Sequence, residues 1–158
     1  MYRNGIGAVI FNKEGLVFVG KRFDKNSCFQ FVQGGIDDGE DYSMALKREL
    51  YEETGIVNYD IVSKSYDSIK YDLPQEIAKK IWNGLYKGQN QWWYLVYFKG
   101  SNQDINLCAT DHPEFSDWEW RDFKNVVDNI VYFKMDMYKK IYEQFSNNIK
   151  VFLNEKQF

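Results

Sequence analysis

The chain has 158 residues, of which 44% are hydrophobic and 27% charged, as is typical of one globular domain with a buried core. Its net charge is -3 and its isoelectric point is about 5.2, whereas proteins that bind long nucleic acids are usually basic. We therefore expect any nucleic-acid partner to be held at one end, without stable binding of a long strand. The longest apolar run is far too short to span a membrane, and the first residues, MYRNGIGAVIF, lack a signal-peptide pattern. These features favour a cytoplasmic protein with no membrane partner.

The cysteines and the histidine offer little chemistry. Cys28 and Cys108 match no metal-ligand spacing and indicate reduced thiols that are buried or half-buried. His112 is the single histidine, and its neighbours Asp111 and Pro113 predict a turn rather than a catalytic base.

The first half of the chain predicts strands followed by one helix. Residues 5–11 and 16–21 are apolar and β-branched around a polar turn, which predicts a strand, a turn and a returning strand. Residues 29–32 predict a third extended segment. Residues 41–54 contain neither glycine nor proline and end before Gly55, so we expect a helix with a C-terminal glycine cap.

The second half predicts more strands and a closing helix. We expect an extended segment at 56–68, broken at 71–74, a short helix or irregular connection at 75–86, a buried strand at 91–98, and a half-buried strand at 115–120. Apolar residues recur at helical intervals from 137 to 149, which predicts an amphipathic helix packed on the core. Residues 154–158 are expected to form a flexible tail. The order of elements predicts an α/β protein with a mixed sheet between helices.

Three carboxylates dominate the predicted internal helix. At 100° per residue, Glu49, Glu52 and Glu53 fall within an arc of about 100°, next to the apolar side formed by Leu46 and Leu50. Like charges at this spacing repel, and a shared divalent cation removes the conflict. Mg²⁺ prefers carboxylate oxygens, water and substrate phosphates. A solvated acidic helix face is the alternative for three acids alone.

The spacing of residues around these acids carries a family resemblance. Residues 34–56 read GGIDDGEDYSMALKRELYEETGI, which resembles the Nudix box G-x5-E-x7-R-E-U-x-E-E-x-G-U, where U is a bulky aliphatic residue. All nine constrained positions match: Gly34, Glu40, Arg48, Glu49, Leu50, Glu52, Glu53, Gly55 and Ile56. The resemblance implies a Nudix-type α/β/α sandwich over residues 1–153 and hydrolysis of a pyrophosphate linkage.

The same resemblance implies roles for the residues of the box. The metal ligands would be the Gly34 carbonyl, Glu49, Glu52 and Glu53, with Mg²⁺ as cofactor and Mn²⁺ or another divalent cation as a possible substitute. Arg48 would orient and neutralise the acids, and Glu40 would brace the start of the helix. A carboxylate would take the proton of the attacking water.

The flanking sequence resembles bacterial RNA pyrophosphohydrolases and the related dinucleoside polyphosphate hydrolases. The likeness includes Tyr2-Arg3, residues 7–10, 21–23 and 29–36, the YDLP sequence at 71–74, residues 88–93, 113–115 and Phe133-Lys134. It departs from that group at Asn4-Gly5, Phe29 and Val32, where two prolines and a tryptophan are usual.

That likeness implies a substrate site outside the box. Glu114 would be a further metal ligand or the catalytic base. Arg3, Arg22 and Lys134 would contact phosphates, and Phe133 would pack on the first base. The plain alternatives are a loop acid, surface charges and a core aromatic residue.

Three functions remain open at this stage. The first is removal of pyrophosphate from the 5′ end of triphosphorylated RNA, or of phosphate from diphosphorylated RNA, which suits an acidic protein that recognises one terminus. The second is cleavage of diadenosine tetraphosphate, for which Trp92, Trp93 or Tyr94 could stack on a second base, although a core strand is the favoured interpretation of that run. The third is a non-enzymatic nucleotide sensor, which the complete set of box acids disfavours.

Overall fold

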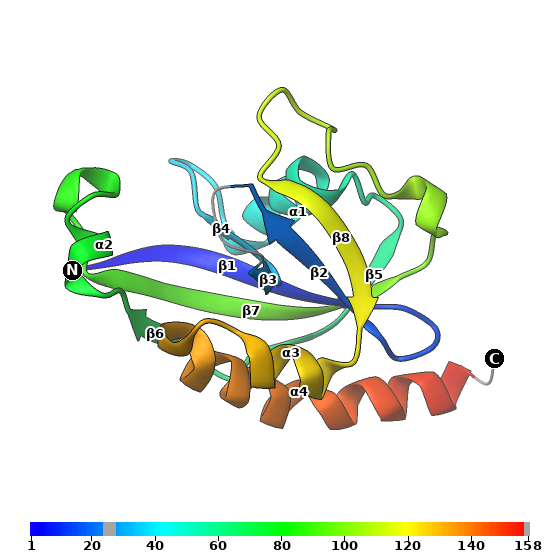
Figure 1. The fold of residues 1–158 in the computed structure, drawn as a ribbon. Helices are drawn as coiled ribbons and strands as arrows, with labels where there is room; N and C mark the ends of the chain where they lie inside the picture. The colour runs from blue at the N-terminus through cyan, green and yellow to red at the C-terminus, as the bar shows by residue number, and fades with distance from the viewer. Residues whose placement is uncertain (24–27, 157–158) are drawn as a thin grey trace.

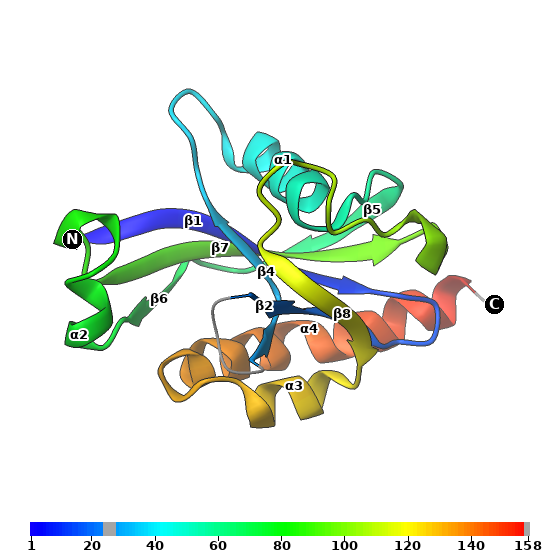
Figure 2. The same cartoon turned by 45° about the horizontal axis from the view of Figure 1, so that its top comes forward.

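A mixed β-sheet between two layers of helices forms the architecture of the computed structural model, which describes residues 1–23 and 28–156 (Figure 1). Helix α1 covers one face of the sheet, and α3 and α4 cover the other (Figure 2). The predicted α/β sandwich with a mixed sheet is therefore confirmed. Within the described ranges, no helix is long and apolar enough to cross a lipid bilayer.

The sheet contains eight strands within the described residues. They are β1 (Tyr2–Phe11), β2 (Val17–Arg22), β3 (Phe29–Gln30), β4 (Val32–Gly35), β5 (Tyr59–Lys64), β6 (Ile69–Asp72), β7 (Gly88–Phe98) and β8 (Phe115–Arg121). The helices are α1 (Tyr42–Thr54), α2 (Gln75–Ala78), α3 (Phe123–Asn129) and α4 (Met135–Lys156), with 3-10 turns η1 (Trp82–Gly84), η2 (Asn102–Asp104) and η3 (Tyr132–Lys134).

The centre of the sheet is a parallel pair, β1 and β7, in register from Tyr2 opposite Gly88 to Phe11 opposite Tyr97. Strand β4 runs antiparallel to the first half of β1, and β2 joins β1 near its end. The strands β5 and β6 both pair with β7, and β3 and β8 both pair with β2. The box segment therefore starts from a strand next to the middle of the sheet.

Alternation along β1 divides the apolar interior into two clusters. Ile6, Ala8 and Ile10 face α1, whereas Val9 and Phe11 face α3 and α4. This follows from the two-residue period of a strand that is covered on both sides. It explains why β1 and β7 carry apolar residues at successive positions.

Several boundaries differ from those expected. Tyr71 does not break the extended segment but is a buried residue of β6, because β6 pairs with the first half of β7. Strand β7 begins three residues before 91, and α4 extends from Met135 to Lys156. The tail expected from residue 154 therefore overlaps the last helical turn, while residues 157–158 lie outside the described residues. Cys28 is half-buried as expected, whereas Cys108 is exposed on a loop.

Candidate active site

Helix α1 begins and ends where its sequence provides caps. The Asp41 side chain accepts a hydrogen bond from the Met44 amide at 2.8 Å, and Gly55 adopts a left-handed conformation with φ of 74°. Leu46 and Leu50 are fully buried against the sheet. Because these two residues fix the rotation of the helix about its axis, the neighbouring acidic face is turned toward β4.

The three acids of α1 occupy different environments. Glu53 is 2% exposed and Glu49 is 7% exposed, whereas the Glu52 side chain is 41% exposed. The sequence predicted one acidic face but not this gradient. It arises because Glu49 and Glu53, four residues apart, lie one above the other on the side that meets β4 and the loop before β8.

Arg48 connects this face to the loop that precedes the helix. Its guanidinium donates to Glu40 at 2.7 and 3.0 Å, to Glu49 at 2.8 Å, to Glu52 at 3.0 Å and to the Gly35 carbonyl at 2.8 Å. The hydrogen bond from Arg48 lowers the pKa of the Glu40 carboxyl. Arg48 therefore neutralises the acids and ties α1 to β4, and Glu40 braces the arginine rather than facing the groove.

The buried carboxylates repel one another. Burial raises the pKa of Glu53 well above its ordinary value, and the proximity of Glu114 and Glu49 raises it further. Burial also raises the pKa of Glu49, against the opposing effect of Arg48. Both Glu53 carboxylate oxygens are buried without a hydrogen-bond partner. An unpaired buried carboxylate is costly, so this cluster suits a cation as its missing partner.

The two glycines at the end of β4 let the acidic cluster approach the backbone. A Cβ atom at Gly34 would overlap the Glu49 carboxyl group, and one at Gly35 would overlap the Arg3 guanidinium. The Gly34 position of the box therefore provides space for a carboxylate directly against the strand. The carbonyl oxygen and the carboxylate oxygens are hard donors of the kind that Mg²⁺ selects.

The donors present fit a divalent cation, although no three His, Cys, Asp or Glu side chains in the described part of the chain already form a complete ligand set. The orphaned oxygens of Glu53 and the cradle at Gly34 are the observations that support the fit. Glu49 and Glu53 would hold the cation from the buried side, and Glu52 and Glu114 from the exposed side. When bound, such a cation polarises phosphoryl oxygens and lowers the pKa of water.

A groove adjoins the carboxylates and collects the predicted substrate residues. Arg3, Arg22, Phe133 and Lys134 all line it, together with Gly34, Gly35, Glu49 and Glu114. These residues come from the start of β1, the end of β2, η3, β4, α1 and the loop before β8. The sequence did not show how close these residues lie to one another. The fold places all of them along one groove.

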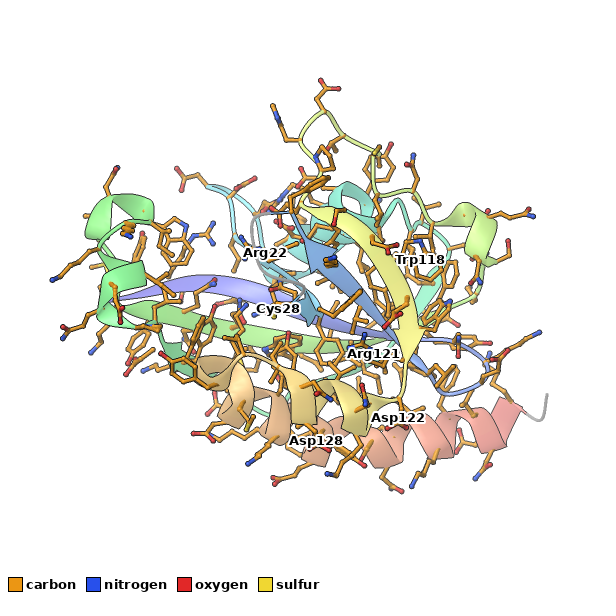
Figure 3. All side chains as sticks on the ribbon, viewed as in Figure 1. Arg22, Cys28, Trp118, Arg121, Asp122 and Asp128 are labelled. Carbon is orange, nitrogen blue, oxygen red and sulfur yellow. The ribbon has the colours of Figure 1, made fainter. Side chains whose placement is uncertain are left out.

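The cationic and aromatic residues of the groove are held by polar and stacking contacts. Lys134 is buried, and its ammonium group donates to Gln30 at 3.3 Å and to Gln33 at 3.2 Å. The Phe133 ring stacks on Tyr71 with ring centroids 6.3 Å apart. Figure 3 shows Arg22 at the end of β2 with Cys28 nearby, and both line a smaller hollow that shares Phe133.

The run at 92–94 belongs to the strand that the sequence favoured over base stacking, whereas some residues of the groove were missed. Trp92, Trp93 and Tyr94 do not line the groove; Trp93 is fully buried, with its ring over Gly7 in β1. Their strand contributes Gln89 instead. The groove also takes Trp82 from the connection expected at 75–86, for which the only sequence signal was a tryptophan next to Asn-Gly in a turn.

Comparison with known proteins identifies the family. The family model described as the NUDIX domain matches residues 1–144. The chain is a Nudix hydrolase. The Nudix hydrolase is 49% identical over 150 residues to an RNA pyrophosphohydrolase of Wolbachia sp. subsp. Brugia malayi (strain TRS), covering 95% of this chain and 93% of that protein. It is 47% identical over 149 residues to the RNA pyrophosphohydrolase of Dinoroseobacter shibae (strain DSM 16493 / NCIMB 14021 / DFL 12), covering 92% of each.

Solved structures show the same fold at low sequence identity. The E. coli dihydroneopterin triphosphate pyrophosphohydrolase superposes on the Nudix hydrolase with a TM-score of 0.71 at 18% identity, covering 94% of this chain and 99% of that one. A C. elegans Ap4A hydrolase in a binary complex superposes with a TM-score of 0.67 at 17% identity, covering 92% and 98%. These similarities establish the fold of the Nudix hydrolase. They do not establish its substrate, which has to be inferred from the site.

Proposed function

We propose that this Nudix hydrolase removes pyrophosphate from the 5′ end of triphosphorylated RNA, or phosphate from diphosphorylated RNA, and leaves a 5′-monophosphate. The observation that carries the proposal is the groove, in which three cationic side chains and the aromatic ring of Phe133 lie beside Glu49 and Glu114. A terminal polyphosphate needs cations, and the base that follows it needs an aromatic face. The relatives named RNA pyrophosphohydrolase, similar over nearly the whole chain, support the same substrate.

The proposed recognition is confined to one terminus. Arg3, Arg22 and Lys134 neutralise the phosphates, and the ring of Phe133 packs on the first base. A chain with a net charge of -3 gains little from the rest of an RNA strand. The predicted affinity therefore depends on the 5′ phosphates and changes little with RNA length.

The proposed chemistry assigns Mg²⁺ to Glu49, Glu52, Glu53, Glu114 and the Gly34 carbonyl, with Mn²⁺ as a substitute. Arg48 keeps the acids oriented through its hydrogen bonds to two of them. The proton of the attacking water passes to a carboxylate, for which Glu52, Glu53 and Glu114 are the candidates. Among these, Glu53 has both oxygens free of hydrogen bonds.

A substrate panel tests the proposal. Purified protein with Mg²⁺ is given 5′-triphosphorylated RNA, 5′-diphosphorylated RNA and diadenosine tetraphosphate, and the products are identified in ¹⁸O-labelled water. We expect pyrophosphate or phosphate release from the RNA ends, with ¹⁸O locating the attacked phosphorus. Rapid cleavage of the dinucleotide without action on either RNA would refute this substrate and favour the second function.

Matched variants connect the activity to the site. Glu53→Gln is expected to lower the rate by roughly 10²–10⁴-fold, the usual scale for an acid–base or electrostatic group. Tyr66→Ala, at a side chain that is 85% exposed and lines no part of the groove, serves as the control. Equal activity in the wild type and Glu53→Gln would show that the chemistry occurs elsewhere.

A further inference from the structure

The connection between β6 and β7 forms one wall of the groove. Leu73, Ile77, Ile81 and Trp82 from this segment line the same groove as Glu49 and Glu114. In both ribbon views α2 lies beyond the starting ends of β1 and β7, beside the N-terminus (Figures 1 and 2). The segment therefore lies where it can contact side chains at the start of β1.

Trp82 makes a specific contact with one of those side chains. The Arg3 guanidinium carbon lies 4.8 Å from the centroid of the Trp82 ring, within the range of a cation–π contact. The guanidinium also approaches Gly35 so closely that a Cβ atom there would overlap it. The Arg3 guanidinium thus lies close both to an aromatic ring and to the bare strand backbone at Gly35.

The backbone that carries Trp82 is strained. Trp82 and Asn83 have φ values of 49° and 56°, and they are the two non-glycine residues with positive φ in the described part of the chain. A bulky residue rarely adopts this conformation. Hydrogen bonds from Gly84 to the Ile81 carbonyl at 2.9 Å and from Leu85 to the Trp82 carbonyl at 3.1 Å close the turn. The Trp82 ring also meets Tyr86 edge-on, with centroids 6.0 Å apart.

We infer that Trp82 is a positioning residue for phosphate recognition: its ring holds the Arg3 guanidinium beside Gly35, so that Arg3 is preorganised to bind the substrate's phosphates. This inference rests on the proposed function, because it concerns the same groove. A stacked guanidinium still directs its N–H donors outward in its own plane, where a phosphate accepts them.

The contact with Trp82 matters because Arg3 forms no ion pair within residues 1–23 and 28–156. A long, flexible side chain loses rotamer freedom when it binds a phosphate, and this loss weakens binding. If the ring and the strand already confine the guanidinium, part of that loss occurs on folding. Trp82 therefore contributes to affinity without touching the reacting phosphorus.

A double-mutant cycle on steady-state kinetics tests the inference. We compare wild type, Trp82→Ala, Arg3→Ala and the double variant on 5′-triphosphorylated RNA. Cation–π contacts of about 0.5–2 kcal/mol correspond to roughly 2–30-fold in binding. Trp82→Ala should raise KM within that range with little change in kcat, and should change KM less than about 2-fold when Arg3 is already alanine.

Two further variants separate positioning from support of the fold. Trp82→Phe keeps an aromatic face and should recover most of the lost affinity. Leu85→Ala removes an exposed side chain from the same turn and should behave as wild type. Equal losses in Trp82→Phe and Trp82→Ala, an undiminished effect in the Arg3→Ala background, or a loss in Leu85→Ala matching that of Trp82→Ala would overturn the inference.

A binding measurement distinguishes this inference from the proposed function. Inorganic triphosphate is titrated calorimetrically into each variant in EDTA, where no turnover occurs. We expect Trp82→Ala and Arg3→Ala each to weaken binding, with the double variant no weaker than Arg3→Ala. If this coupling appears but no RNA is hydrolysed, only the proposed function fails. If RNA is hydrolysed and the coupling is absent, only the role of Trp82 fails.

Discussion

Glu53→Gln is expected to stabilise the ion-free protein while it abolishes most activity. Glu53 is 2% exposed, its oxygens have no hydrogen-bond partner, and it lies close to Glu49 and Glu114. The neutral amide removes a buried charge and can donate to either neighbour. A buried unpaired polar group costs about 1–3 kcal/mol. We expect the free energy of unfolding in EDTA at neutral pH to rise by about that amount.

Thermal and urea unfolding measure this change. For a chain of this size 1 kcal/mol corresponds to roughly 2–4 °C in Tm, so the expected rise is roughly 2–12 °C. Adding Mg²⁺ should stabilise the wild type more than the variant, because an ion that binds the native state adds stability by linkage. Glu52→Gln is the matched control: its side chain is 41% exposed and paired with Arg48, so its effect should stay within about 1 kcal/mol.

The result that would refute the reasoning is specific. If Glu53→Gln in EDTA is as stable as the wild type or less stable, the carboxylate is not under the electrostatic strain described. If Mg²⁺ stabilises the wild type and Glu53→Gln equally, Glu53 does not bind the ion. Either result would require another origin for the loss of activity.

Further predictions concern pH and the residues that shape the site. The pKa of Glu53 is raised in the folded state. The gain in unfolding free energy from Glu53→Gln should therefore be small below about pH 4.5 and should grow as pH rises through that raised pKa. Parallel denaturation curves from pH 4 to 8 in EDTA test this. Gly34→Ala should lower the rate sharply and destabilise the folded protein by about 1–3 kcal/mol, because the added methyl group overlaps the Glu49 carboxyl. Urea unfolding and kinetics test this, and wild-type values would contradict it. Arg48→Lys should lower kcat by at least about 10-fold, since one ammonium group cannot replace the fork that reaches Glu40, Glu49 and the Gly35 carbonyl; unchanged kcat would contradict the orienting role.

The elements of this protein were largely readable from its sequence because local signals agreed with the fold. The helix at 42–54 had a capping aspartate and a terminal glycine, and the closing helix had a regular apolar face. Tyr71 was misjudged because the YDLP sequence resembles a turn, whereas pairing with β7 keeps it in a strand. That pairing depends on residues about twenty positions away, which local patterns do not encode.

The candidate site was predictable in composition but not in arrangement. The box spacing indicated which acids matter, yet only the folded chain distinguishes buried Glu53 from half-exposed Glu52. Trp82 could not be found from periodicity, because its conformation is left-handed and its partner Arg3 lies far away in sequence. Such contacts arise from tertiary packing, which overrides local propensity.

The parallel pairing of β1 with β7 has a consequence for how the chain acquires its structure during synthesis. Gly88, which pairs with Tyr2, is made more than eighty residues after it. Until then one long side of the innermost strand has no partner, and its apolar residues remain available for wrong contacts. Pairings between distant residues slow folding. We therefore expect nascent chains that end before residue 88 to remain sensitive to protease, and protection to appear only after β7 has emerged.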